Sequence, residues 1–358
     1  MLIVVLGGAM KKLPTDMPVA AYQGAGNIPV ETRPVPSPAP ECVLIEIDRC
    51  GICGTDIHML LEGWSDKPGS VAGHEWTGTI VALGDGVTDW SVGEAVVGGM
   101  TPKCGVCRRC QEGKPSQCEN RTGQISDAYD GAFARYKVAP VNSLLRMPDG
   151  LDPRSATLAE PLAVALHAVT QSKITADDSA MIIGAGPIGA LTLAVLRHRG
   201  IGPITVVEPS QPRRDLALQL GAHRVAEPSE LEIFPSWEPE HITENPVSVV
   251  FECSGKKAAM EAGFNQLRRG GVLVLVGSGI EHPSFDPNRL ILNELQIIGS
   301  FIYDKFGFED ALALLNDPSF PSEKILEPED VSLAGLGDAL VNISQGRVAG
   351  KVLVAPWL

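Results

Sequence analysis

The chain has 358 residues, of which 44% are apolar, as expected for a globular protein of about two domains. Its formal net charge is −14, and because phosphate-binding surfaces need clustered lysine and arginine, nucleic acid is excluded as the expected partner. No apolar run reaches the roughly 18 residues of a membrane-spanning helix, and the start of the chain lacks the basic region of a secretory signal. We therefore expect a cytoplasmic protein without a membrane partner.

The first 150 residues are rich in glycine and proline, with short apolar runs between turn signals. Two of these runs, residues 42–47 and 76–83, have the length and composition of β-strands. This part of the sequence predicts an irregular β domain built from short strands.

Four of the eight cysteines lie close together in this domain: Cys104, Cys107, Cys110 and Cys118. Four thiolates at this spacing can surround one tetrahedral Zn²⁺ and leave no open position, which is the pattern of a structural zinc site. The alternatives are an iron–sulfur cluster, which spacing alone does not exclude, and ordinary buried thiols.

A second set of possible metal ligands is spread more widely. A catalytic zinc needs three protein ligands and an open position for substrate. Cys53 and His74 are suitable ligand types, and Glu160 lies near the inferred border between two domains, where it can face a cofactor. From the residues alone the indication is modest, because an isolated histidine is more often a core or surface group.

Strands and helices alternate in the second half of the chain, which predicts a parallel sheet covered by helices on both faces. We expect strands over 180–183, 205–207, 248–251 and 272–276, and helices over 188–198, 213–220 and 256–267. Residues 225–247 contain four prolines and predict an irregular connection. A further strand from about 295, a helix over 308–316 and a closing strand over 351–354 complete the expected order.

A glycine-rich motif follows the first of these strands and opens a helix, as a dinucleotide site requires. Its residues are Gly184, Ala185, Gly186, Pro187, Ile188 and Gly189. Glu208 ends the next strand, where a carboxylate binds ribose hydroxyls and repels a 2′-phosphate, so we expect NAD rather than NADP. Arg213 and Arg214 follow and can accommodate such a phosphate. The alternative is a glycine-rich turn with a surface glutamate.

Together with residues 251–255 and 270–274, these motifs come in the order found in zinc-containing medium-chain alcohol/polyol dehydrogenases. The chain resembles that family over nearly its whole length. The resemblance implies an α/β protein in three parts. These are a GroES-like β catalytic domain (1–161), a Rossmann NAD-binding domain with a doubly wound parallel sheet (162–299), and a C-terminal return to the catalytic domain (300–358).

The resemblance also implies roles for individual residues, with two zinc ions per chain. Cys53, His74 and Glu160 resemble the catalytic zinc ligands, and Glu75 the neighbouring carboxylate that ligates transiently. Thr55 and His58 resemble the proton relay. The NAD contacts are implied at Gly184, Gly186, Pro187, Ile188, Gly189, Glu208 and Arg213, and Cys42, Cys50 and Cys253 match no ligand position.

We therefore expect a zinc-dependent oxidoreductase that transfers hydride between NAD and an alcohol/ketone pair. The expected partner is a small-molecule secondary alcohol, polyol or sugar-derived alcohol, and the resemblance implies a homodimer or homotetramer. A glutamate at position 160, in place of a second cysteine, resembles the polyol, threonine and secondary-alcohol branch. Candidate pocket residues are Leu60, Leu61, Trp64, Phe133 and Phe301. The competing hypothesis is a zinc-stabilised nucleotide-binding protein without catalysis.

Overall fold

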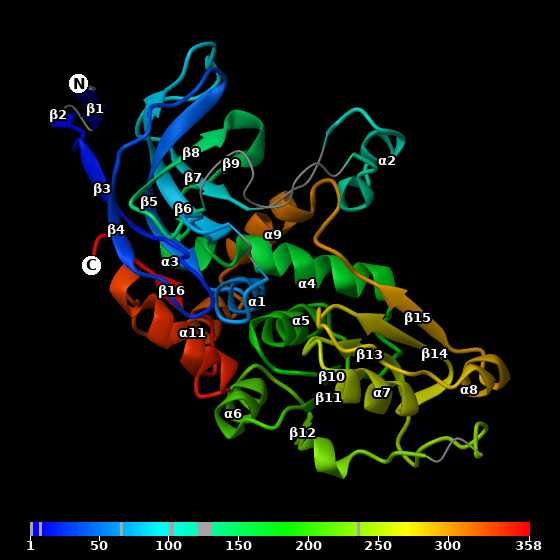
Figure 1. Ribbon diagram of the computed structural model, residues 1–358. Helices are drawn as coiled ribbons and strands as arrows, with labels where there is room; N and C mark the ends of the chain where they lie inside the picture. Colours follow the sequence, from blue (N-terminus) through cyan, green and yellow to red (C-terminus); the bar gives the residue numbers. More distant parts are fainter. Residues whose placement is uncertain (1–2, 7–8, 65–66, 100–103, 121–130, 235–236) are drawn as a thin grey trace.

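The structure is a computed structural model that describes residues 3–6, 9–64, 67–99, 104–120, 131–234 and 237–358. It consists of an antiparallel sheet and a parallel sheet, each with its own layers, joined through a long helix (Figure 1). Among the described residues, no helix has the length and apolar character needed to cross a membrane.

The antiparallel sheet forms the first domain, with strand order β16-β5-β6-β7-β9 and with β8 also paired to β5. β5 and β6 are buried along most of their lengths and build its core, which includes Ile45, Ile47 and Ile80. Its strands are β5 (Cys42–Gly51), β6 (Glu75–Leu83), β7 (Ala95–Gly98), β8 (Tyr136–Pro140), β9 (Leu144–Arg146) and β16 (Leu353–Val354). Two separate hairpins are β1 (Ile3–Leu6) with β2 (Ala9–Lys12), and β3 (Asp16–Ala20) with β4 (Val30–Pro34).

The register of this sheet brings distant segments together at Gly51. Gly51 pairs with Glu75 of β6 on one side and with Leu353 of β16 on the other. A Cβ atom on Gly51 would lie 2.3 Å from Oε2 of Glu75, so only glycine leaves room for that carboxylate. The last strand of the chain therefore lies on one side of β5, and the strand that carries Glu75 lies on the other.

The parallel sheet forms the second domain, with strand order β12-β11-β10-β13-β14-β15. β10 and β13 are buried along their whole lengths, as expected for central strands covered on both faces. The strands are β10 (Ala180–Ile183), β11 (Ile204–Val207), β12 (Arg224–Ala226), β13 (Val247–Glu252), β14 (Leu267–Leu275) and β15 (Gln296–Gly299). The connecting helices are α5 (Pro187–His198), α6 (Gln211–Gln219), α7 (Lys257–Asn265) and α8 (Pro287–Leu292).

Helix α4 (Ala159–Ser172) packs against α5 of the second domain and against α9 (Gly307–Leu315). The border expected between residues 161 and 162 falls inside this helix. Its apolar side chains share one continuous core with α5, α9 and Leu353. The remaining helices are α1 (Gly54–Leu60), α2 (Arg108–Gln111), α3 (Pro153–Ala156), α10 (Ser322–Ile325) and α11 (Leu336–Ser344). Short 3₁₀ turns are η1 (Pro115–Gln117), η2 (Val141–Ser143), η3 (Pro228–Glu230) and η4 (Leu333–Gly335).

The elements expected for the second domain are confirmed, with three corrections. Residues 224–226 form strand β12 at the start of the segment predicted to be irregular, because they pair with β11. The helix expected over 256–267 ends at Asn265, because Leu267 already belongs to β14. Only Leu353 and Val354 of the expected closing strand are in strand β16. The helices over 159–172, 287–292 and 336–344 were not predicted.

Candidate active site

Three possible metal ligands meet where β5 ends and β6 begins. Cys53 directly precedes α1, and Glu75 begins β6 immediately after His74. The ligand atoms of Cys53, His74 and Glu75 all lie within 4.8 Å of one another. His74 is 7% exposed and Glu75 is fully buried, while Cys53 is half-buried and gives the cluster its access to solvent.

Glu160 lies beside this cluster, but it is not one of the residues whose ligand atoms all lie within 4.8 Å of one another. It occupies the first turn of α4 and is 5% exposed. Burial raises the pKa of its carboxyl to about 7, against the opposing influence of His74. Within the described part of the chain, no lysine, arginine or histidine forms an ion pair with Glu160, so its charge is available to a bound cation.

Asp56 lies next to Nδ1 of His74, and the sequence analysis did not identify it as a site residue. It is fully buried on α1, and its Oδ2 accepts a hydrogen bond of 2.8 Å from the backbone amide of Cys53. Its Oδ1 lies 3.8 Å from Nδ1 of His74, and neither of these two buried atoms has a hydrogen-bond partner. A metal on Nε2 of His74 would make Nδ1 the donor towards Asp56, which is how carboxylates orient metal-binding histidines.

Lys351 is the second residue that the sequence reasoning missed. Its Nζ lies 2.7 Å from Oε1 and 2.6 Å from Oε2 of Glu75, and it donates to the carbonyl of Ile52 at 3.1 Å. Lys351 is 2% exposed and Glu75 is fully buried. Burial lowers the pKa of Lys351, but Glu75 and the Cys53 thiolate outweigh it, so the net shift is upwards and the lysine stays charged.

The charges of this site fit a divalent metal ion. Cys53, Asp56, Glu75 and Glu160 are four groups that become negative when deprotonated, and Lys351 is one buried cation beside them. Burial lowers the pKa of His74, but the Cys53 thiolate and then Asp56 and Glu160 raise it well above its usual range. A group of anions that holds a proton this strongly will also bind a metal ion in its place, and metal binding releases the proton. Thiolate, imidazole and carboxylate are the donor types that zinc prefers.

The two residues expected in the proton relay both lie on α1. Oγ1 of Thr55 is 3.6 Å from Sγ of Cys53, so Thr55 lies beside the possible metal ligands. His58 lies one turn further along α1, where its Nδ1 is 2.7 Å from Oε2 of Glu62. The Trp64 ring stacks on its imidazole, with centroids 4.4 Å apart.

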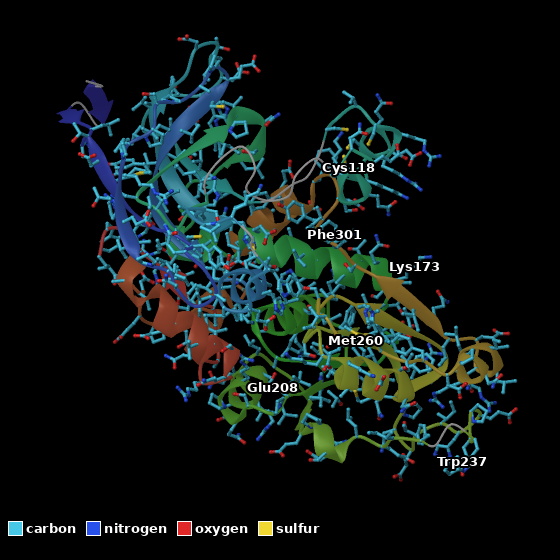
Figure 2. All side chains as sticks on the ribbon, viewed as in Figure 1. Cys118, Lys173, Glu208, Trp237, Met260 and Phe301 are labelled. Atoms are coloured by element: carbon cyan, nitrogen blue, oxygen red, sulfur yellow. The ribbon has the colours of Figure 1, made fainter. Side chains whose placement is uncertain are left out.

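The other four cysteines form a lobe around α2 that stands apart from both sheets, where Figure 2 labels Cys118. All four sulfur atoms lie within 4.8 Å of one another, and Sγ of Cys107 and Sγ of Cys118 are 4.0 Å apart. A tetrahedral zinc with Zn–S bonds of about 2.3 Å separates its sulfurs by about 3.8 Å. The spacing therefore fits one zinc ion and is far too long for a disulfide.

Backbone amides of the lobe point at its sulfur atoms. The amide of Cys107 donates to Sγ of Cys104 at 3.3 Å, and the amide of Glu119 donates to Sγ of Cys107 at 3.4 Å. Hydrogen bonds from Val106 and Cys107 lower the pKa of Cys104 to about 6. Such donors stabilise the thiolate, which is the form that binds zinc.

We expect Cys104→Ser to lower stability and metal content, with a smaller effect on any reaction at the Cys53 site. The variant removes one of four ligands from a closed zinc site, whose metal binding contributes directly to folding. Metal analysis should find one zinc per chain instead of two, together with a lower melting temperature. Cys42→Ser is the control, because Cys42 is buried away from both metal groups and should leave the zinc content unchanged. Two retained zinc ions in Cys104→Ser would contradict the structural assignment.

The glycine-rich motif joins β10 to α5. Gly184 has φ +92°, a conformation that favours glycine, and Gly186 caps α5 with Pro187 as its first residue. A Cβ on Gly189 would lie 1.9 Å from the carbonyl oxygen of Gly184, so helix and loop can pack this closely only with glycine. The start of a helix with such backbone amides is suited to a pyrophosphate, so the cofactor role expected for this motif stays a prediction.

Glu208 directly follows the second strand of this unit, which ends at Val207 rather than at Glu208 as expected, and Figure 2 shows it near α6. Its Oε2 accepts the Ala185 amide at 2.7 Å and its Oε1 accepts the Ser210 amide at 2.9 Å. Each carboxylate oxygen keeps a second lone pair, so these bonds hold Glu208 against the glycine-rich loop and still allow it to accept ribose hydroxyls.

Both arginines that follow Glu208 have partners within the chain. Arg213 donates to the carbonyls of Val348 and Ile343, each at 3.0 Å, and so ties α6 to the C-terminal segment. Arg214 donates to the Glu208 carbonyl at 2.7 Å and pairs with Glu227 at 2.9 Å. The cofactor role of Arg213 stays a prediction.

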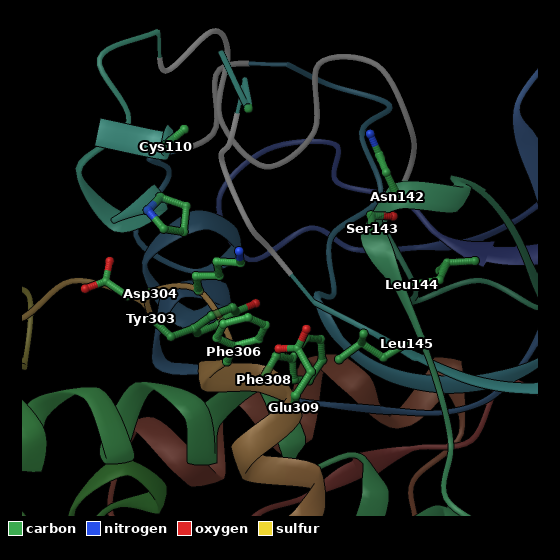
Figure 3. A pocket seen from close by; sticks show the side chains of 13 residues that line it. Cys110, Asn142, Ser143, Leu144, Leu145, Tyr303, Asp304, Phe306, Phe308 and Glu309 are labelled. Atoms are coloured by element: carbon green, nitrogen blue, oxygen red, sulfur yellow. The ribbon is translucent and has the colours of Figure 1, made fainter. Parts of the chain in front are cut away.

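Of the candidate pocket residues, two are core residues of the first domain. Phe133 is fully buried and Leu60 is 2% exposed, and both pack among its apolar side chains. Phe301 and Trp64 are exposed. Tyr303 is one of the residues that line the cavity between the cysteine lobe and α9, shown in Figure 3. Its hydroxyl also lies near Gly99, where an added Cβ would be 3.1 Å away.

Comparison with known proteins places the chain in a family. The alcohol dehydrogenase GroES-like domain matches residues 39–149, and the zinc-binding dehydrogenase domain matches residues 187–317. Sorbitol dehydrogenase from Halalkalibacterium halodurans is 33% identical over 341 residues, which cover 94% of this chain and 98% of that protein. L-Threonine 3-dehydrogenase from Xanthomonas campestris pv. campestris (strain B100) is 31% identical, covering 93% and 97%.

The solved structure of a zinc-binding dehydrogenase from Sinorhizobium meliloti, bound to NADP, superposes with a TM-score of 0.83 at 31% identity, over 96% of this chain and all of that one. The chain belongs to the zinc-containing medium-chain alcohol/polyol dehydrogenase family. This confirms the predicted combination of a GroES-like and a Rossmann domain. It also confirms the predicted class of enzyme, an alcohol oxidoreductase that uses zinc and NAD or NADP.

Proposed function

We propose that the protein oxidises a secondary alcohol, polyol or sugar-derived alcohol with NAD⁺, and reduces the matching ketone in reverse. The observation that carries this proposal is the meeting of Cys53, His74 and Glu75 at one point, with Glu160 beside them. A thiolate, an imidazole and a carboxylate are a ligand set that leaves one position of a zinc ion open for substrate.

Cys53, His74 and Glu160 would hold the catalytic zinc, and Cys104, Cys107, Cys110 and Cys118 the structural zinc. Glu75 is the weaker candidate for a permanent ligand because both of its oxygens already bind Nζ of Lys351. Its proximity to Cys53 and His74 supports the transient role expected for it. When bound, zinc supplies Lewis-acid activation of the alcohol oxygen and NAD⁺ accepts the hydride.

The residues of α1 would carry the alcohol proton away from the metal centre. Thr55 lies against Cys53 and is placed to accept that proton by hydrogen bond. His58, one turn further along α1 and partly exposed, would deliver it to solvent.

The residues around Glu208 support NAD over NADP. The Glu208 carboxylate would repel a 2′-phosphate, and the guanidinium groups of Arg213 and Arg214 are bound to carbonyl oxygens of the chain. We therefore expect kcat/KM for NAD⁺ to exceed that for NADP⁺ by at least about tenfold, a difference of about 1.4 kcal/mol.

The test is a screen of secondary alcohols, polyols and amino-alcohols, with NAD⁺ and NADP⁺ in parallel and the zinc content measured on the same protein. Reduction of NAD⁺ by one substrate class and two zinc ions per chain would support the proposal. One zinc per chain and no turnover of any alcohol would instead indicate a zinc-stabilised nucleotide-binding protein.

We also propose a homodimer or homotetramer that works in the cytoplasm. β15 is an edge strand of the parallel sheet, and Ile291 and Leu292 of the preceding helix α8 are exposed nearby in sequence. Unpaired strand edges flanked by apolar side chains are suited to pairing with a second copy. The eight free cysteines are consistent with a reducing compartment.

A further inference from the structure

His58 is held by two residues that belong to no metal group and to no predicted relay. Nδ1 of His58 lies 2.7 Å from Oε2 of Glu62, one turn further along the chain. The Trp64 ring lies over the imidazole at an interplanar angle of 13°, with centroids 4.4 Å apart. The amide of Trp64 also donates to the carbonyl of His58 at 3.1 Å, which fixes the loop that carries the indole.

The contact with Glu62 determines which nitrogen of His58 carries the proton. A carboxylate can only accept hydrogen bonds, so Nδ1 must be the donor and the neutral ring must have its lone pair at Nε2. Among the described residues, none forms a hydrogen bond with Nε2 of His58. That nitrogen therefore remains able to take up a proton.

We propose that Glu62 and Trp64 are positioning residues for proton release, holding His58 with Nδ1 protonated and Nε2 as the proton acceptor. This inference rests on the proposed function, in which Thr55 and His58 carry the alcohol proton to solvent. During alcohol oxidation, Nε2 takes up the proton and the ring becomes an imidazolium ion. Glu62 stabilises this ion through the bond at Nδ1, and Nε2 then passes the proton to water or buffer.

The exposure of these groups argues against a mainly structural role. The side chain of Glu62 is 43% exposed and that of His58 is 18% exposed. Glu62 also lies beyond the end of α1 at Leu60. Because exposed ion pairs contribute little to stability, variants at Glu62 should fold normally and report on the orientation of the ring.

The first measurement is ¹⁵N NMR of the zinc-loaded enzyme labelled at its seven histidines, with His58→Asn used to assign the His58 signals. We expect shifts typical of a protonated Nδ1 and an unprotonated Nε2 in the natural sequence. In Glu62→Ala the ring should lose this preference, because the acceptor at Nδ1 is gone. Unchanged His58 shifts in Glu62→Ala would overturn the proposal.

The second measurement is alcohol oxidation under saturating NAD⁺. Glu62→Ala should lower kcat by about tenfold with little change in KM for the alcohol, and added imidazole buffer should restore the rate. Trp64→Ala should behave similarly, whereas Trp64→Phe should keep most of the activity because it keeps the stacking. An unchanged kcat in Glu62→Ala would also overturn the positioning role.

Glu232→Gln is the matched control, because Glu232 contacts His241 at 3.2 Å on the surface of the other domain and should affect neither measurement. Failure of the proposed function would look different, since the natural sequence would then oxidise no alcohol. In that case the NMR shifts would still show which ring nitrogen of His58 carries the proton.

Discussion

Cys53→Ser should abolish NAD⁺-dependent alcohol oxidation while leaving the fold intact. The variant replaces a thiolate by a hydroxyl, which is a poor zinc ligand, in a cluster whose other members are His74 and the neighbouring carboxylates. Lewis-acid activation by a metal contributes several kcal/mol, so its loss should lower kcat by roughly 10³-fold or more. The measurements are steady-state turnover and zinc content, which should fall from two ions to one.

Cys53 is half-buried at the N-cap of α1, a position that serine also favours, so its replacement by serine should cost little stability. Circular dichroism and the melting temperature should therefore remain close to those of the natural sequence. Cys42→Ser again serves as the control, with full turnover expected. If Cys53→Ser retained both zinc ions and normal turnover, the catalytic site would have to lie elsewhere.

Lys351→Met should destabilise the protein by about 3–5 kcal/mol, because it leaves the fully buried carboxylate of Glu75 without its cation. The measurement is the urea midpoint of the zinc-loaded enzyme. Arg146→Met provides a matched control, since the ion pair of Arg146 with Glu94 is exposed and its loss should cost less than about 1 kcal/mol.

A double variant separates the charge of Lys351 from its packing. Lys351→Met combined with Glu75→Gln removes both charges, so we expect it to be more stable than Lys351→Met alone. We expect the effects of the two substitutions on stability to be non-additive, because Nζ of Lys351 makes two short contacts with the carboxylate oxygens of Glu75. Equal stability of the natural sequence and Lys351→Met would show that this buried pair does not support the fold.

Features that depend on neighbouring residues could be predicted from the sequence. The strand at 180–183 and the helix after it follow from a short apolar run, a glycine-rich turn and a proline at the helix start. The four cysteines of the lobe lie within one short segment, so their spacing alone indicated one metal. The family motifs then supplied the ligand roles of Cys53, His74 and Glu160, which spacing alone suggested only weakly.

Other features depend on contacts between residues far apart in the chain. Lys351 reaches Glu75 only because β16 pairs with β5, which joins the end of the chain to its first domain. The proximity of Asp56 to His74 likewise could not be predicted, because the two residues belong to separate segments of the sequence. Only the fold shows that Arg213, the expected cofactor contact, also binds the carbonyls of Val348 and Ile343.

Local patterns and the order of motifs predicted the second domain, the cysteine lobe and a set of candidate metal ligands, because these signals lie in short stretches of the sequence. The fold was needed to show which charges neutralise one another inside the site and which arginines bind backbone carbonyls. Burial and ion pairing depend on distance in space, and the pairing of strands from opposite ends of the chain sets that distance.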